Sequence, residues 1–137
     1  MADRSLVWFF PDLAPPVSPS YFAEEDLEKV AVRIHADTVP HSGDCKIDIM
    51  ADGVSIFIDH TFDYIGYKRV GVNIVPDTTV ALPETQNSEE YAEMFTPDDI
   101  SAGAWITCKL TAPSGARNIT VILELNRVTE SDEPSTI

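Results

Sequence analysis

The stretch that decides the fold class of this chain is Cys45-Lys46-Ile47-Asp48-Ile49-Met50-Ala51-Asp52-Gly53-Val54-Ser55-Ile56-Phe57-Ile58-Asp59. Apolar and polar residues alternate on both sides of Asp52-Gly53, and such alternation is typical of a half-buried strand. An Asp-Gly pair readily adopts the two positive φ angles of a type I′ turn, which joins two antiparallel strands. The segment therefore predicts a β-hairpin and an antiparallel β protein.

The alternation also predicts which side chains of the hairpin face the core. Two sets are expected to point inward: Cys45, Ile47 and Ile49 before the turn, and Val54, Ile56 and Ile58 after it. Phe57 is expected to pack on the outer side, because neighbouring residues of a strand point to opposite faces.

Further strands follow from the same pattern elsewhere in the chain. They are expected at residues 27–35, 69–75, 79–82, 104–111 and 118–128. In the first of these, Val30, Val32 and Ile34 are expected inward, and Lys29, Arg33 and His35 outward. In the last, the predicted inward face is Ile119, Val121, Leu123 and Leu125.

Helix signals are few. The i, i+4 spacing of Tyr91 and Phe95 predicts one or two helical turns over residues 88–95. Thr96-Pro97, followed by two acids, indicates the start of another short helix. With seven or eight strands and almost no helix, the sequence predicts an all-β antiparallel sandwich, either jelly-roll-like or immunoglobulin-like.

Three regions differ in composition. Residues 1–26 are expected to form an extended hydrophobic and proline-rich arm, residues 27–128 the β-sandwich domain, and residues 129–137 a disordered tail. The prolines of residues 11–20 fix φ and remove amide donors, so they predict a semi-rigid spacer.

The arm is the predicted partner-binding segment. Its large apolar side chains are Trp8, Phe9 and Phe10, with Tyr21 and Phe22 behind them. In an isolated molecule such a run would be an aggregation liability. The arm therefore either folds back on its own sheet or docks on a neighbouring subunit.

Charge and length limit the function classes. The chain has 137 residues and a net charge of -14, from 9 basic and 23 acidic residues. Such a chain repels phosphate backbones and anionic membrane surfaces, so we expect no nucleic-acid partner. No run approaches the ~20 apolar residues of a membrane span, so we expect no membrane insertion.

The N-terminus lacks a signal-peptide layout, which predicts a reducing compartment and buried free thiols at Cys45 and Cys108.

The sequence contains no recognisable catalytic motif. It has neither a GxSxG elbow nor an HExxH segment, so we expect no enzyme and no cofactor.

Several potential metal ligands fall near one end of the predicted sheet: His35, Asp37, His41, Asp44 and His60. Their spacing matches no metal motif, so we expect no metal site. The aromatic residues that are candidates for stacking on sugars are Trp105, Tyr64, Tyr67 and Tyr91.

The hairpin segment resembles a recurrent segment of small tailed-bacteriophage virion proteins. The shared pattern is the "DI..DG.SIF" hairpin at residues 48–57, an "F....I..G" turn at Phe95 to Gly103, and two closing strands. The likeness covers roughly residues 28–127 and does not include the arm. The resemblance implies a capsid-decoration, head-tail or tail-fibre component without catalytic residues.

Taken with these observations, the resemblance implies a non-enzymatic structural protein of a phage-like virion, made in the host cytoplasm and located in the particle. Its arm would anchor the sandwich to neighbouring subunits, and its acidic surface would keep free copies soluble. The expected partners are other virion proteins, further copies of the chain in a homo-oligomer, and a host-surface glycan. The alternative is a carbohydrate- or receptor-binding β-sandwich module.

Overall fold

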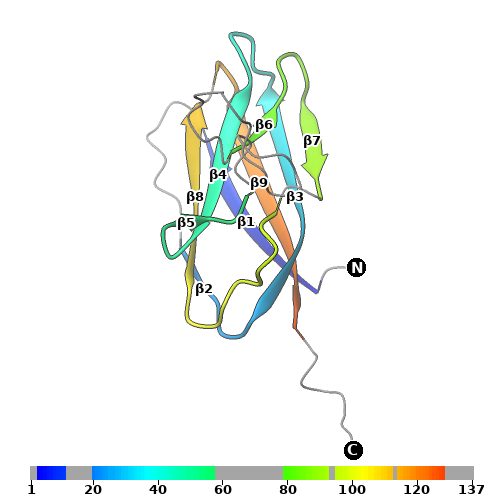
Figure 1. The fold of residues 1–137 in the computed structure, drawn as a ribbon. Coiled ribbons are helices and arrows are strands. Elements are labelled where there is room, and N and C mark those ends of the chain that lie inside the picture. The colour runs from blue at the N-terminus through cyan, green and yellow to red at the C-terminus, as the bar shows by residue number, and fades with distance from the viewer. Residues whose placement is uncertain (1–2, 12–19, 58–78, 93–94, 113, 129–137) are drawn as a thin grey trace, which may run out of the picture.

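The computed structural model describes residues 3–11, 20–57, 79–92, 95–112 and 114–128, which form two antiparallel sheets packed face to face (Figure 1). The first sheet has the order β1-β9-β3-β7 and contains β1 (Arg4–Phe10), β9 (Arg117–Arg127), β3 (Leu27–Thr38) and β7 (Ser88–Tyr91). The second has the order β2-β8-β4-β5 and contains β2 (Tyr21–Phe22), β8 (Trp105–Ala112), β4 (Cys45–Ala51) and β5 (Val54–Ser55). A further strand, β6 (Val80–Leu82), also pairs with β4. The predicted antiparallel β-sandwich is confirmed.

The Asp-Gly hairpin forms as predicted. Asp52 and Gly53 have φ angles of 52° and 82°, and Ala51 pairs with Val54 across the turn. The inward set of β4 is also confirmed, because Cys45, Ile47 and Ile49 are fully buried.

After the turn, the predicted burial is correct for Ile56 but wrong for Val54 and Phe57. Val54 is 70% exposed, whereas Ile56 and Phe57 are both buried. β5 ends at Ser55, whose Oγ accepts a hydrogen bond from the Phe57 amide at 3.1 Å. Beyond this point the chain leaves the hairpin and Phe57 forms a bridge with Phe95, so strand alternation no longer decides which side chain is buried. Ile58 lies outside the described residues.

A β-bulge reverses the prediction for Lys29. The register between β3 and β9 shifts between Lys29 and Ala31, and an extra residue in one strand changes the face of its neighbours. The Lys29 ammonium is turned toward the end of the sandwich, where its Nζ donates to Thr96 O at 2.9 Å and to Thr96 Oγ1 at 2.7 Å. Val30 is only half-buried, while Val32 and Ile34 face the core as predicted.

Neither predicted helix forms in the described residues. Residues Ser88–Tyr91 are strand β7, which pairs with β3, and Arg33 forms an ion pair with Glu90 at 3.2 Å across that pairing. Residues 96–100 are irregular, with a bend at residues 97–98, and Ile100 exchanges two backbone hydrogen bonds of 2.9 and 2.8 Å with Leu27. Pairing with other strands therefore overrides the local helix signals.

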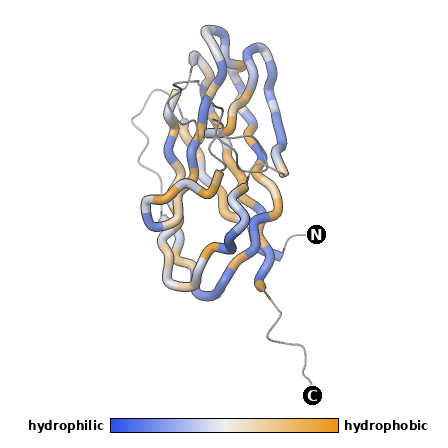
Figure 2. Tube along the Cα trace, in the orientation of Figure 1, coloured by the Kyte–Doolittle hydropathy of each residue, from blue (hydrophilic) through white to orange (hydrophobic). Residues whose placement is uncertain are grey.

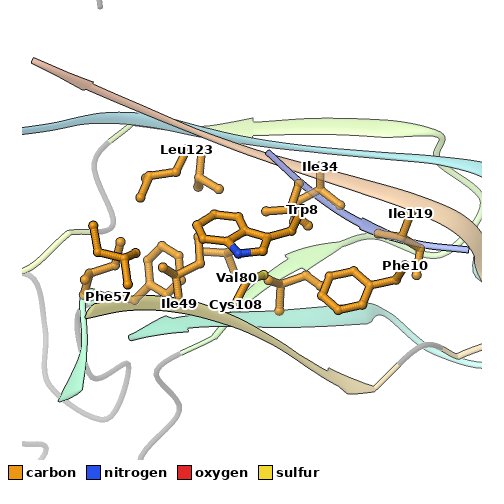
Figure 3. Packing of buried hydrophobic residues seen from close by; sticks show 14 of the residues in the cluster. Trp8, Phe10, Ile34, Ile49, Phe57, Val80, Cys108, Ile119 and Leu123 are labelled. Carbon is orange, nitrogen blue, oxygen red and sulfur yellow. The ribbon is translucent and has the colours of Figure 1, made fainter. Parts of the chain in front are cut away.

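The N-terminal run is a strand of the sandwich rather than a separate arm. β1 pairs with β9 from Arg4↔Leu125 to Phe10↔Ile119. Trp8 and Phe10 are 0% and 2% exposed, and Figure 3 shows the Trp8 indole in the middle of the core. The boundary drawn at residue 26 is therefore corrected, because β1 and β2 belong to the two sheets. For β1 the structure shows the fold-back alternative, since every second residue of the run faces the core.

Neither of the two cysteines forms a disulfide and both are buried, as predicted. Burial raises the pKa of Cys45 from 9.0 to about 11. Burial also raises the pKa of Cys108, and the charges of Asp48 and Cys45 raise it further.

Candidate functional site

The most prominent exposed feature of the described residues is a pair of aromatic rings on the outer face of the second sheet. β2 pairs with β8 so that Phe22 lies opposite Trp105. The ring centroids are 5.0 Å apart with an interplanar angle of 58°. Phe22 is 50% exposed and Trp105 is 51% exposed. We call Phe22 and Trp105 the aromatic pair.

The backbone around the aromatic pair is fixed by the hairpin turn. The Trp105 amide donates to Asp52 Oδ1 at 3.0 Å, and the Asp52 amide donates to the Trp105 carbonyl at 2.9 Å. On the other side of β8, the Ala23 amide donates to the Ala104 carbonyl at 2.9 Å. The backbone beneath the rings is therefore hydrogen-bonded on both sides of β8, so we expect a partner to pay little entropy for ordering it.

The predicted partner-binding residues divide between core and surface. Trp8 and Phe10 lie in the core and cannot contact a neighbour in this fold. Tyr21 is half-buried, with its ring edge-on to Trp8 and its hydroxyl donating to the Val7 carbonyl at 2.8 Å. Only Phe9, which is 52% exposed on β1, and Phe22 present their rings to solvent.

The predicted glycan-binding residues do not form one surface within the described part of the chain. Tyr64 and Tyr67 lie outside it. Tyr91 is on β7 of the first sheet, and its hydroxyl donates to the Ala81 carbonyl at 2.6 Å. Desolvation by burial raises the pKa of Tyr91. Of the four residues, Trp105 alone is described on the outer face of the second sheet.

The potential metal ligands do not converge. His35 contacts Ser88 Oγ through Nδ1 at 2.6 Å and Asp37 through Nε2 at 3.6 Å. The described residues contain no group of three or more His, Cys, Asp or Glu side chains placed to hold a metal ion. His60 lies outside them. In the same part of the chain, no helix is long and apolar enough to cross a membrane.

A cavity of about 350 Å³ opens at the end of the sandwich, between the hairpin and residues 96–104. Lys29 lines it together with the carboxylates of Asp98 and Asp99. Burial lowers the pKa of Lys29, while the charges of the two aspartates raise it. Because the Lys29 ammonium already donates twice to Thr96, we assign it to holding residues 96–104 against β3.

Sequence reasoning missed both the aromatic pair and the cavity. Nothing in the local pattern indicates that β2 pairs with β8, so the sequence predicts Phe22 as an arm residue and Trp105 as a possible sugar contact without bringing them together. The alternation predicts Lys29 on the solvent face, because a β-bulge leaves no simple signal in the sequence.

Comparisons of the chain with protein-family models, with curated proteins and with solved structures found no match.

Proposed function

We propose that this chain is a non-enzymatic structural domain of a virion-like particle, and that it binds a neighbouring protein through the aromatic pair. The observation that carries the proposal is the half exposure of two large rings that contact each other on a hydrogen-bonded sheet. Aromatic side chains of this kind dominate the energy of protein–protein interfaces. The resemblance of residues 28–127 to small phage virion proteins supports the particle as the place of action.

The rings provide enough apolar surface for a useful contact. Covering roughly 200 Å² of ring surface at about 25 cal/mol per Å² contributes on the order of 5 kcal/mol before the entropic cost of association. In this proposal the anchor is the aromatic pair instead of Trp8 and Phe10, which already stabilise the core.

Incorporation into particles tests the proposal. A tagged chain is produced together with the particles of the organism that encodes it, and the particles are separated on a density gradient. We expect the wild-type chain to sediment with the particles. We expect the double variant Phe22→Ser, Trp105→Ser to stay in the top fractions of the gradient, where free protein remains. Val54→Ser is the matched control, because Val54 is exposed at the hairpin tip and lies outside the aromatic pair. A wild-type chain absent from the particles contradicts the proposal.

The second candidate function is binding of a carbohydrate at Trp105. Its exposed indole favours stacking on a sugar face, as in many β-sandwich modules. However, the 58° angle between the rings forms a notch instead of a flat platform, which suits a protein side chain better.

Titration of oligosaccharides against tryptophan fluorescence discriminates the two candidates. Trp8 is fully buried, so a shift on adding a glycan reports on Trp105. A shift that Trp105→Ala removes supports the sugar site, whereas no response across a broad glycan panel favours the protein partner.

A further inference from the structure

Strand β1 leaves one edge of the first sheet open in the described part of the chain. There it pairs with β9 on one side and has no strand on the other. The Val7 carbonyl accepts the Tyr21 hydroxyl, so this carbonyl points away from β9. Because backbone groups alternate along an antiparallel strand, Ser5 and Phe9 direct their amides and carbonyls to the same open side.

The side chains beside this edge are apolar and exposed. On the outer face of β1, Val7 is 45% exposed and Phe9 is 52% exposed. No charged residue occurs from Ser5 to Phe10. Natural proteins usually protect an edge strand with charge, proline or a cover, since unpaired backbone groups and apolar side chains recruit another strand.

We propose that this edge pairs with β1 of a second copy of the chain, antiparallel and about a twofold axis near Val7. Such a pairing places Val7 opposite Val7 of the other copy and Ser5 opposite Phe9. The strand is therefore complementary to itself, with no charge facing another charge between Ser5 and Phe9. The two four-stranded sheets join into one continuous sheet of eight strands.

The charge distribution favours pairing of β1 with β1 of a second copy. The opposite edge of the same sheet is β7, which is hydrophilic along its length (Figure 2) and carries Glu89 and Glu90. Pairing through β1 places the two acidic β7 edges at the far ends of the joined sheet. A head-to-tail arrangement would put apolar β1 against acidic β7. For chains of charge -14, the first arrangement minimises repulsion.

Tyr21 does not close the edge. A carbonyl oxygen has two lone pairs, so the bond from Tyr21 leaves the Val7 carbonyl able to accept another. The Tyr21 ring lies 5.4 Å from the ring of Trp8, which points into the core, and this places Tyr21 on the inner side of β1. The outer side remains accessible to a second strand.

This pairing uses a different strand from the aromatic pair and stands independently of the proposed function. The test is chemical cross-linking of Val7→Cys with a short bismaleimide. The native thiols Cys45 and Cys108 are buried, so the introduced thiol is the one that reacts in the folded protein. Val54→Cys is the matched control, because Val54 is 70% exposed and lies at the hairpin tip.

We expect Val7→Cys to give a covalent dimer at dilute protein concentration and Val54→Cys to give at least tenfold less. Light scattering of the unmodified chain is expected to show a dimer. Phe9→Lys is expected to raise the dimer dissociation constant at least tenfold while circular dichroism stays that of a β protein. A wild-type monomer at every concentration, or equal cross-linking of the two cysteine variants, would overturn the proposal.

Discussion

Trp8 and Phe9 are neighbours in β1, yet their side chains differ completely in burial. Adjacent strand residues point to opposite faces, so Trp8 is fully buried and Phe9 is 52% exposed. The sequence alone does not show which of these two side chains is buried, because the residues on both faces of the run are apolar. The assignment depends on β1 pairing with β9, a contact between opposite ends of the described chain.

Substitution of these two residues by alanine is expected to have unequal effects on stability. Trp8→Ala removes a side chain from the centre of the core and is expected to lower the free energy of unfolding by about 3–5 kcal/mol. Phe9→Ala is expected to lower it by less than about 1 kcal/mol, because its ring is half exposed. Urea unfolding at low protein concentration measures both, and equal losses would contradict the assignment of β1 to the core.

The buried thiols predict a fall of stability at alkaline pH. Burial raises the pKa of Cys45 to about 11, and that of Cys108 is also raised, whereas an exposed thiol in the unfolded chain ionises near 9. The unfolded state therefore loses protons first, so stability is full below pH 9 and declines as pH rises from about 9 to 11.

The double variant Cys45→Val, Cys108→Val isolates this effect. We expect urea midpoints of the wild type to decline more steeply between pH 9 and 11 than those of the variant. Lys29, whose pKa is lowered, and Tyr91, whose pKa is raised, titrate equally in both proteins and cancel in the comparison. Parallel curves would show that the thiols ionise without unfolding.

Among the elements, those with strong local patterns were predicted well. The predicted strands at 104–111 and 118–128 match β8 and β9 within one residue at each end. The inward face of β9 was correct in all four residues, because regular alternation continues through the strand. The bulge in β3 and the strand β7 were missed, because both depend on partners distant in sequence.

At Gly53 in the hairpin turn, the cost of a positive φ angle can be measured without any steric clash of the new side chain. Gly53 has φ 82°, and a Cβ added there would meet no atom within 4 Å. Gly53→Ala is therefore expected to cost about 1 kcal/mol of stability through the backbone alone. Asp52→Asn is the control, since Asn also tolerates positive φ and keeps the oxygen that accepts the Trp105 amide. A neutral Gly53→Ala in thermal and urea unfolding would argue against the type I′ turn.

At the scale of the whole molecule, the sequence predicted the sandwich but neither of the two surfaces that we propose as contacts. The aromatic pair exists because β2 joins β8, and the open edge exists because β1 joins β9. Both are consequences of topology, which local alternation does not specify.

Removal of residues 1–20 tests this topology. Because β1 supplies Trp8 and Phe10 to the core, we expect the truncated chain to lose its cooperative unfolding transition. Circular dichroism and light scattering of the truncated and full-length chains measure this. The variant Phe9→Lys is the control, since it alters the outer face of β1 and leaves the core intact. A folded, monomeric truncated chain would contradict the role of β1.

The place of β9 in the first sheet has a consequence for biosynthesis. β9 lies between β1 and β3 and pairs with both, yet it is the last strand along the described chain. During translation, β1 emerges early and has no strand of its sheet to pair with until residues 117–127 leave the ribosome, whereas β3 can pair with β7 before then. Until then Trp8 and Phe10 lack the strand that places them in the core, so the nascent chain carries these large apolar side chains uncovered. The sheet therefore closes in a late, non-local step, which makes slow folding and a need for chaperone protection the expected behaviour of the newly made protein.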